Sequence, residues 1–449
     1  MLSALGTLIR NSENKALETL SVVTDSVRCF RIDMPTPRRE TMNNGKRRRS
    51  QDDSERIPYK IPKVSSEEKR EKASFNTEQN INNIVSNVSV NDNKETKSSD
   101  TPVCNGNAVL VVKHYNSILN ENDKRHKSRI FYMRNFNNWI KSILINTYLT
   151  RIKSKYLRPI NALDLCCGKG GDLFKWKTGF MKKLICVDLA DVLLKECQNR
   201  YENILKKCSR NNEHLFAAEF ITADCTKERI RKKFEDPSIS LDMVSCQFAF
   251  HYCFESLEQA ECMMKNASEC LKPEGYFIGT IPNAYELVSR WQRCDGNTFG
   301  NDIYKVEFLC DKTNPPLFGA KYYFQLEGVV NCPEFLVYLP VFTKLASKFG
   351  LELIMFERFD KFYEDKMVEG TDLLRKINVF ECYPPWNGRT LGKAEKDYEH
   401  VKKYMQTHPN CRDIGTLSQP EWEVVSLYAV FAFQKKKTTW NNEGKPEYV

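Results

Sequence analysis

The 449-residue sequence has no run of apolar residues long enough to cross a membrane as a helix. Such a span needs about 18 consecutive apolar residues, so we expect no membrane contact of this kind. A targeting peptide is also not expected, because the opening stretch MLSALGTLIR is short and is soon followed by Glu13, Glu18 and Asp25. The net charge of +10 is the feature that indicates a binding partner, because it suits a polyanion such as nucleic acid.

No C-x-x-C pair occurs among the 17 cysteines. Structural zinc sites usually contain such pairs, so the sequence predicts no metal ion. The cysteines are scattered, and some, such as Cys186 and Cys246, stand inside apolar runs that resemble strands. We therefore interpret them as reduced thiols that serve as small core residues.

Large apolar side chains are scarce from about residue 36 to residue 106, where Asn, Ser, Lys, Asp and Glu prevail. This composition cannot bury enough surface to offset the entropy of ordering, so we expect residues 1–106 to be mostly disordered. The segment contains a basic cluster at residues 46–49, with Lys60 and Lys63 beyond it. A nuclear-import signal, an RNA-contacting tail and a solvated run of charges all remain open for this cluster.

From residue 107 to residue 449 we expect one folded domain, with order beginning near Val109. The stretch SRIFYMRNFNNWIKSILINTYLTRI repeats apolar residues at helical spacing. Strand-like runs then alternate with helix-like ones: NALDLCC, KLICVDL, EFITADC, LDMVSCQF and GYFIGTIP are the strands, and LELIMFERF and VVSLYAVFAFQ complete them. This alternation predicts a doubly wound α/β fold with a parallel sheet and helices on both faces. Ligands of such folds bind beyond the carboxyl ends of the strands.

The loop LDLCCGKGGD, residues 163–172, follows the first expected strand. A phosphate-binding P-loop is excluded because Lys169 is followed by glycine instead of a hydroxyl residue. The dinucleotide pattern G-x-G-x-x-G fails at its first position, which is Cys166. The remaining pattern, an acid followed by alternate glycines, is typical of S-adenosylmethionine-dependent methyltransferases. Asp164, Gly168 and Gly170 fit it, with Cys166 again at the first glycine.

Two further acids follow the next two expected strands. Asp188 stands 20 residues after Gly168, where an acid can accept hydrogen bonds from ribose hydroxyls. Asp224 ends the third strand and suits the exocyclic amine of adenine. Either carboxylate could instead cap a helix. A dehydrogenase would share the ribose-binding acid, but no second glycine loop follows for the other half of a dinucleotide.

Several longer strings resemble the eukaryotic mRNA cap guanine-N7 methyltransferases, a family of class I S-adenosylmethionine-dependent enzymes. They are SRIFYMRNFNNWIKS, LDLCCGKGGDLFKW, AEFITADC, SCQFAFHYCFES, GYFIGTIPN, LEGVVNCPEFLVY and GTLSQPEWEVVSLYAVFAF, and they span about residues 109–434. The resemblance implies a Rossmann-like sheet with a cap-binding insertion, S-adenosylmethionine as cofactor, the capped mRNA 5′ end as partner, and a place in the nucleus. Whether a small activating subunit or the transcription and capping machinery also binds stays open.

The resemblance also implies roles for individual residues. Those expected at the cofactor are Lys141, Asp164, Cys166, Gly168, Asp188, Asp224, Gln247 and Tyr252. Those expected at the cap or RNA are Asn137, Asn138, Lys169, Lys175, Arg200, His251, Glu334 and Tyr428. Taken singly, His251, Glu334 and Tyr428 could equally be a satisfied core histidine, a helix cap and a core tyrosine.

The implied reaction transfers a methyl group to guanine N7, which has a lone pair and no proton. We therefore expect no catalytic acid or base, and rate enhancement by positioning and electrostatics. Cys166 costs little if its φ is negative and about 1 kcal/mol if its φ is positive. Two alternatives remain: a catalytically inactive cap-binding protein, and a methyltransferase that acts on another purine or a small molecule.

Overall fold

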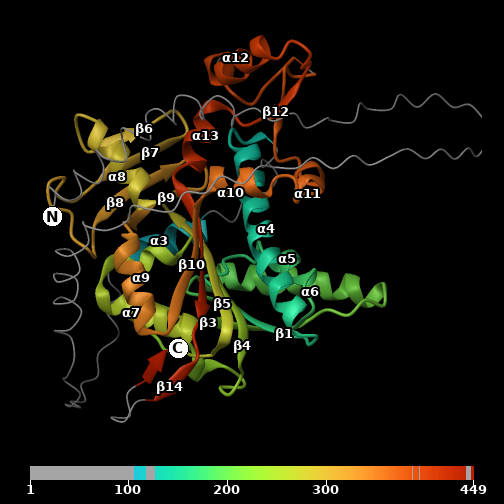
Figure 1. Cartoon of the computed structure of the whole chain (residues 1–449), viewed down its shortest axis with the longest axis vertical. Helices are drawn as coiled ribbons and strands as arrows, with labels where there is room; N and C mark the ends of the chain where they lie inside the picture. Colours follow the sequence, from blue (N-terminus) through green and yellow to red (C-terminus); the bar gives the residue numbers. More distant parts are fainter. Residues whose placement is uncertain (1–105, 118–126, 387, 394, 441–445, 449) are drawn as a thin grey trace, which may run out of the picture. The chain divides into compact units, whose positions relative to one another are not determined.

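The computed structural model describes residues 106–117, 127–386, 388–393, 395–440 and 446–448 (Figure 1). Apart from residue 106, the segment expected to be disordered lies outside the described residues, and so does its basic cluster at residues 46–49. The first helix of the described residues is α3, Gly106–Ser117, which includes Val109.

A seven-stranded sheet forms the centre of the fold, in the order β10-β13-β5-β4-β1-β2-β3. Its strands are β1 Ile160–Leu165, β2 Met181–Asp188, β3 Ala217–Thr222, β4 Leu241–Gln247, β5 Leu271–Pro282, β10 Leu351–Arg358 and β13 Tyr428–Lys435. The doubly wound α/β fold is thereby confirmed. The expectation of a parallel sheet holds for β1 to β5.

The last strand departs from the expectation in two ways. β13 runs antiparallel to both of its neighbours, β5 and β10. In addition, Val424 and Val425, expected in this strand, end helix α13, Gln419–Val425. A capping box in which Ser418 and Glu421 bond each other's backbone starts that helix. This local signal outweighs the β propensity of the two valines.

Alternate residues of the central strands belong to two separate hydrophobic cores. Leu184 and Cys186 of β2 lie in one core, and Ile185 and Val187 lie in the other. Because successive side chains of a strand point to opposite faces, both faces of the sheet are covered. Figure 1 shows α4, α5 and α6 on one side and α7 and α9 on the other. These helices are α4 Phe131–Lys155, α5 Leu173–Lys177, α6 Asp191–Arg210, α7 Leu257–Ser268 and α9 Leu339–Lys348.

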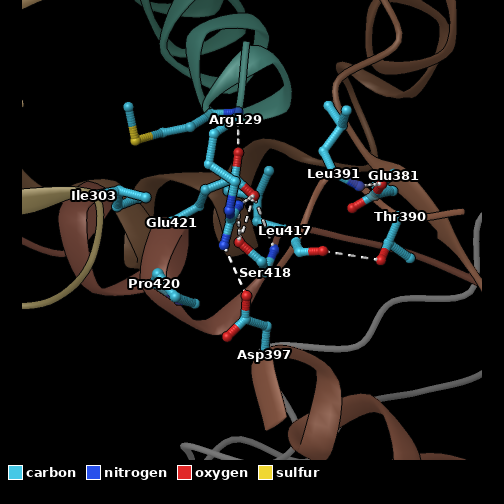
Figure 2. Close-up of polar contacts among 12 residues, drawn as sticks. Arg129, Ile303, Glu381, Thr390, Leu391, Asp397, Leu417, Ser418, Pro420 and Glu421 are labelled. Atoms are coloured by element: carbon cyan, nitrogen blue, oxygen red, sulfur yellow. Dashed lines mark hydrogen bonds and ion pairs between the residues drawn. The ribbon is translucent and has the colours of Figure 1, made fainter. Parts of the chain in front are cut away.

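Helix α4 confirms the helical spacing expected for its segment and is one helix of 25 residues. Its beginning is held by a buried ionic network (Figure 2). The Arg129 guanidinium donates to Ser418 Oγ and to Asp397 Oδ2, each at 2.9 Å. Glu421 Oε1 accepts from the backbone N–H of Met133 at 3.1 Å. Residues from the C-terminal part of the chain thus hold the beginning of α4. Asn137 and Lys141 of this helix line the cavity described below.

A second, antiparallel sheet of four strands, in the order β6-β7-β8-β9, is inserted between α8, Ala284–Arg293, and α9. Its strands are β6 Thr298–Gly300, β7 Tyr304–Phe308, β8 Lys321–Leu326 and β9 Val330–Phe335. Glu334 lies on β9 directly opposite Tyr322 of β8, so it does not cap a helix. The insertion therefore supplies a strand-borne carboxylate to the site.

The remaining elements are short. They are α10 Phe359–Lys366, α11 Thr371–Lys376, α12 Glu399–Thr407, the strand pair β11 Glu381–Tyr383 with β12 Ile414–Thr416, and the pair β14 Thr438–Trp440 with β15 Pro446–Tyr448. Among the described helices, none combines the length and apolar character that a membrane span requires.

Candidate functional site

A cavity of about 430 Å³ opens beyond the carboxyl ends of β1, β2 and β4. Its volume is in the range of small-molecule sites. Thirteen of the sixteen residues expected at the cofactor or the cap line it: Asn137, Lys141, Asp164, Cys166, Gly168, Lys169, Asp188, Asp224, Gln247, His251, Tyr252, Glu334 and Tyr428. Asn138, Lys175 and Arg200 are not in its wall.

The loop after β1 has three residues in the left-handed region of backbone space. The φ angles are +56° at Cys166, +52° at Gly168 and +70° at Gly170. The question left open for Cys166 is thus answered in favour of a positive φ, at a cost of about 1–2 kcal/mol relative to glycine. Such strain persists only where the surrounding structure enforces it, and it concentrates at functional sites.

The two glycines of this loop that have a positive φ, Gly168 and Gly170, are required for different reasons. A Cβ on Gly170 would stand 2.6 Å from Cys197 Sγ and 2.8 Å from Leu173 Cδ1, so the loop packs too closely on α6 and α5 for a side chain. A Cβ on Gly168 would meet nothing within 4 Å. Gly168 lines the cavity, so here the missing side chain leaves room for a ligand against the backbone.

Asp188 ties the end of β2 to the glycine loop. Its Oδ2 accepts from Gly168 N at 2.7 Å and its Oδ1 accepts from Ala190 N at 2.8 Å. Burial raises the pKa of Asp188 to about 7, and the neighbouring Cys166 sulfur adds to the shift, although the two backbone donors oppose it. Asp188 lines the cavity, and a hydrogen-bond donor on a ligand would stabilise its ionised form.

A buried cluster of two acids and two lysines lies behind the loop. Asp172 Oδ1 is 2.8 Å from Lys141 Nζ and 2.7 Å from Lys175 Nζ. Burial alone would raise the pKa of Asp172, but the two lysines lower it to about 2. For Asp164, burial and the nearby Asp172 carboxylate raise the pKa well above its usual value. Lys141 and Lys175 are thus held by Asp172, which the sequence analysis did not single out.

The three expected cap residues outside the cavity wall have protein partners. Asn138 Oδ1 accepts from Lys175 Nζ at 2.5 Å, one helical turn from the Lys141–Asp172 pair. Arg200 pairs with Glu196 on the surface of α6. Asn138 is bonded to Lys175, and Lys175 pairs with Asp172, which lines the cavity. Arg200 has no such connection to the cavity wall among the contacts of the described residues.

Another part of the cavity wall is built by the residues that follow β3 and by the end of β4. Asp224 Oδ1 accepts from the backbone and hydroxyl of Thr226, at 2.9 and 2.6 Å. Gln247 ends β4 and donates from Nε2 to Ser245 Oγ at 3.0 Å. Its Oε1 is buried without a hydrogen-bond partner among the described residues. An unsatisfied buried acceptor beside a cavity is where a ligand's donor is expected.

Helix α3 forms a wall of the cavity that the sequence analysis missed. Tyr115 Oη lies 3.1 Å from Tyr252 Oη. Asn107 donates to Glu255 Oε1 at 2.7 Å and accepts from Lys321 Nζ at 2.8 Å. The segment GNAVLVVKHYNS shows weak helical periodicity and follows a polar stretch, so only its apolar VLVV run signalled order.

The other end of the cavity gathers residues that lie far apart in the sequence. Glu334 is 3% exposed. Its Oε2 accepts from the Tyr322 hydroxyl at 2.7 Å, and its Oε1 is 3.3 Å from His251 Nε2. Tyr428 lines the cavity and also packs on Phe359 and Phe248, with ring centroids 5.7 and 5.2 Å away. Tyr428 is therefore both a core residue and a wall of the site.

These observations fit S-adenosylmethionine. The Asp188 carboxylate lines the cavity and can accept hydrogen bonds from hydroxyl groups, the open side of Gly168 admits a ligand to the backbone, and Gln247 presents an acceptor without a partner among the described residues. The excess of carboxylates over lysines around the loop also suits a cationic sulfonium ligand.

Comparison with known proteins identifies relatives across the described fold. The model of the mRNA (guanine-N(7))-methyltransferase domain matches residues 95–436. An mRNA cap guanine-N(7) methyltransferase of Drosophila melanogaster is 47% identical over 346 residues, which cover 76% of this chain and 80% of that protein. Proteins of the same name from Caenorhabditis elegans and Schizosaccharomyces pombe are 38% and 34% identical, over 73% and 77% of this chain and 87% and 88% of theirs.

Proposed function

Because the chain belongs to the mRNA (guanine-N(7))-methyltransferase family, we propose that it transfers a methyl group from S-adenosylmethionine to N7 of the 5′-terminal guanosine cap of mRNA. The observation that supports this assignment is that one cavity is lined by two different sets of residues, one at each of its ends. One end holds the Asp188 carboxylate against the glycine loop, and the other holds the buried Glu334 carboxylate.

Guanine recognition is assigned to the Glu334 end. Guanine presents N1–H and an exocyclic N2 amine on one edge, and a carboxylate accepts from both. Tyr322 donates a hydrogen bond to Oε2 of Glu334, and His251 Nε2 lies 3.3 Å from Oε1, so the carboxylate is oriented before the base arrives. Tyr428 offers an aromatic surface for the base.

The triphosphate bridge and the RNA are assigned to the basic and amide side chains near the loop. Lys169 lines the cavity, and Lys175 borders it beside Asn138. Arg200 lies on α6, where it pairs with Glu196. Their role is charge and hydrogen bonding to phosphate oxygens. Asn137 and Asn138 are assigned to the capped RNA.

The cofactor end orients its ligand through a few groups. Asp188 accepts from the ribose, Asp224 from the adenine amine, and the backbone of residues 166–168 borders the methionine portion. Lys141, Asp164, Gln247 and Tyr252 complete this wall. When bound, S-adenosylmethionine supplies a methyl group activated by its sulfonium charge.

No general base is needed, because N7 carries no proton. The chain's contribution is to bring the nucleophile and the methyl donor together in one cavity. Such positioning can account for several kcal/mol of barrier reduction. His251 and Glu334 are accordingly binding residues in this account.

The test uses GpppG-capped RNA and S-adenosylmethionine labelled in the methyl group, followed by nuclease digestion to locate the label. We expect one labelled methyl per cap, at guanine N7, and none on RNA whose cap carries 7-deazaguanine. Label on internal bases or ribose would overturn the assignment. Binding of capped RNA without binding of S-adenosylmethionine would favour a catalytically inactive cap-binding protein, and methylation of free purines alone would favour a different substrate.

We also propose that the protein acts in the nucleus and that the basic cluster at residues 46–49 supports import. Replacing the four residues of the cluster with serine should reduce nuclear accumulation while leaving methylation of short capped RNA unchanged. Methylation by the purified chain alone tests whether an activating subunit is needed.

A further inference from the structure

Three cysteines from three segments meet behind the glycine loop. Cys167 belongs to the loop itself, Cys186 lies on β2, and Cys197 lies on α6. Their sulfur atoms are all within 4.8 Å of one another. No local spacing announces this cluster, because its members are separated by 19 and 11 residues in the sequence.

The three thiols have no assigned role in methyl transfer. Cys186 and Cys197 are fully buried, and Cys167 is partly exposed and lines the cavity. A ligand that reaches the cluster therefore has one thiol at the cavity wall and two behind it.

The sulfur arrangement is close to that of a thiolate metal site. With zinc–sulfur bonds of about 2.3 Å and tetrahedral angles, ligand sulfurs stand about 3.8 Å apart. Closing the cluster from its present spacing requires sulfur shifts of about 1 Å or less. Three protein ligands leave a fourth position, and the partly exposed Cys167 directs it towards the cavity, where water supplies the ligand.

We propose that Cys167, Cys186 and Cys197 form a binding site for a thiophilic divalent ion, Zn²⁺, and that its occupation weakens the binding of S-adenosylmethionine. On binding, the three thiol protons are released to solvent, and each sulfur donates an electron pair to the ion. The complex then carries one net negative charge. No electron is transferred.

The coupling follows from how the cluster supports the loop. Cys197 Sγ stands 2.6 Å from the position that a Cβ on Gly170 would occupy, so this sulfur sets the floor of the loop. Cys167 directly precedes Gly168, whose N–H donates to Asp188. Drawing the sulfurs together therefore moves the backbone that borders the cofactor. By linkage, the cofactor must weaken zinc binding by the same factor.

The first experiment titrates the metal-free, full-length protein with Zn²⁺ against a competing chromophoric chelator. We expect one tight site per chain, and Cys186→Ala and Cys197→Ala should each weaken it by more than about tenfold. Cys208→Ala and Cys246→Ala are the matched controls, since Cys208 lies on the same helix as Cys197 and both controls are buried. Neither control should change zinc affinity.

Thermal melting checks that each variant is folded, and X-ray absorption at the zinc edge of the loaded wild type counts its sulfur ligands independently of mutation. Three sulfur ligands are expected. Unchanged zinc affinity in either Cys186→Ala or Cys197→Ala, or fewer than three sulfur ligands on the zinc, would overturn the site.

The second experiment measures S-adenosylmethionine affinity by calorimetry with and without one equivalent of Zn²⁺. The dissociation constant should rise in the wild type and stay unchanged in Cys186→Ala. Zinc binding that leaves the wild-type constant unchanged would overturn the coupling. Both readouts are independent of the RNA substrate, so they stand apart from the test of cap methylation.

Discussion

The two ends of the cavity are built in opposite ways. At the cofactor end, Asp164, Cys166 and Gly168 lie close together in β1 and its loop, Asp188 ends β2, and Asp224 comes two residues after β3. At the end proposed to bind guanine, His251, Glu334 and Tyr428 come from three separate elements and are 83 and 94 residues apart in the sequence. The cofactor end is shaped by a strained backbone, and the guanine end by buried side chains that hold one another.

Because of this difference, the two ends should respond to different kinds of substitution. A backbone site depends on φ angles and on missing side chains, so small changes of shape matter there. A site of buried polar side chains depends on every partner being present, because a lone buried group is costly. The two ends are therefore expected to fail independently, and the predictions below exploit that.

The largest effect is expected from removing α3, which contacts both ends. A chain that begins at residue 127 should lose nearly all cap methylation, because Tyr115 and Asn107 no longer reach Tyr252, Glu255 and Lys321. A chain that begins at residue 106 is the control and should keep its activity on a short capped RNA. Equal activity of the two chains would show that α3 is dispensable.

Next in size is Glu334→Gln. Loss of the charged acceptor should cost about 1.5–3 kcal/mol, or roughly ten- to a hundredfold in kcat/KM for capped RNA. The control is Tyr322→Phe, which removes one donor to the carboxylate and should cost less. An equal loss of S-adenosylmethionine affinity in Glu334→Gln would mean that this carboxylate is structural.

A pH effect on the cofactor end should be smaller within the physiological range. In the proposed complex, ribose hydroxyls donate to the ionised form of Asp188, whose pKa is raised to about 7 in the free protein by burial. The dissociation constant for S-adenosylmethionine should therefore be constant above about pH 7 and rise about tenfold per pH unit below it.

Calorimetry across this range checks the effect, with Asp188→Asn as the control. The variant should bind more weakly and show no such slope. A slope of the same size in Asp188→Asn would assign the titration to another group.

The smallest effect is expected from Cys166→Gly. Glycine relieves about 1–2 kcal/mol of strain at a φ of +56° but adds about 0.4–1 kcal/mol of unfolded-chain entropy, so the net gain should lie between zero and about 1.6 kcal/mol. Cys166→Ala keeps the Cβ and should show no gain, and urea unfolding distinguishes the two. Destabilisation by glycine would mean that the cysteine side chain contributes more through packing than its backbone costs.

The contrast between the two ends also explains what the sequence could and could not predict. The strands, the glycine loop and Asp188 follow local patterns, so periodicity and spacing located them. The antiparallel direction of β13 arises from its pairing with β5 and β10, which lie far from it in the sequence, so no local pattern encodes it. Glu334 lies in a local hairpin of β8 and β9, but the approach of this hairpin to the cavity depends on tertiary packing. His251, Glu334 and Tyr428 were therefore identified through the family resemblance, and the spacing of the residues carried no signal for them.

Other features escaped because they depend on packing. The φ of Cys166 depends on how the loop packs in the folded chain, so the residue type could not reveal its sign. Asp172 was missed because its importance comes from Lys141, which lies on another helix. Asn138, Lys175 and Arg200 were expected at the cap, but the structure gives their side chains protein partners outside the cavity wall.

The central claim is that one cavity joins two independently built ends, and a four-way binding measurement tests it most directly. Calorimetry would measure the affinity of S-adenosylmethionine and of the cap dinucleotide GpppG for each of two variants, Asp188→Asn and Glu334→Gln. We expect Asp188→Asn to lose affinity for S-adenosylmethionine only and Glu334→Gln to lose affinity for the cap only, each by about tenfold or more. If either variant loses both ligands to the same extent, the two ends are not separate sites and the account is wrong.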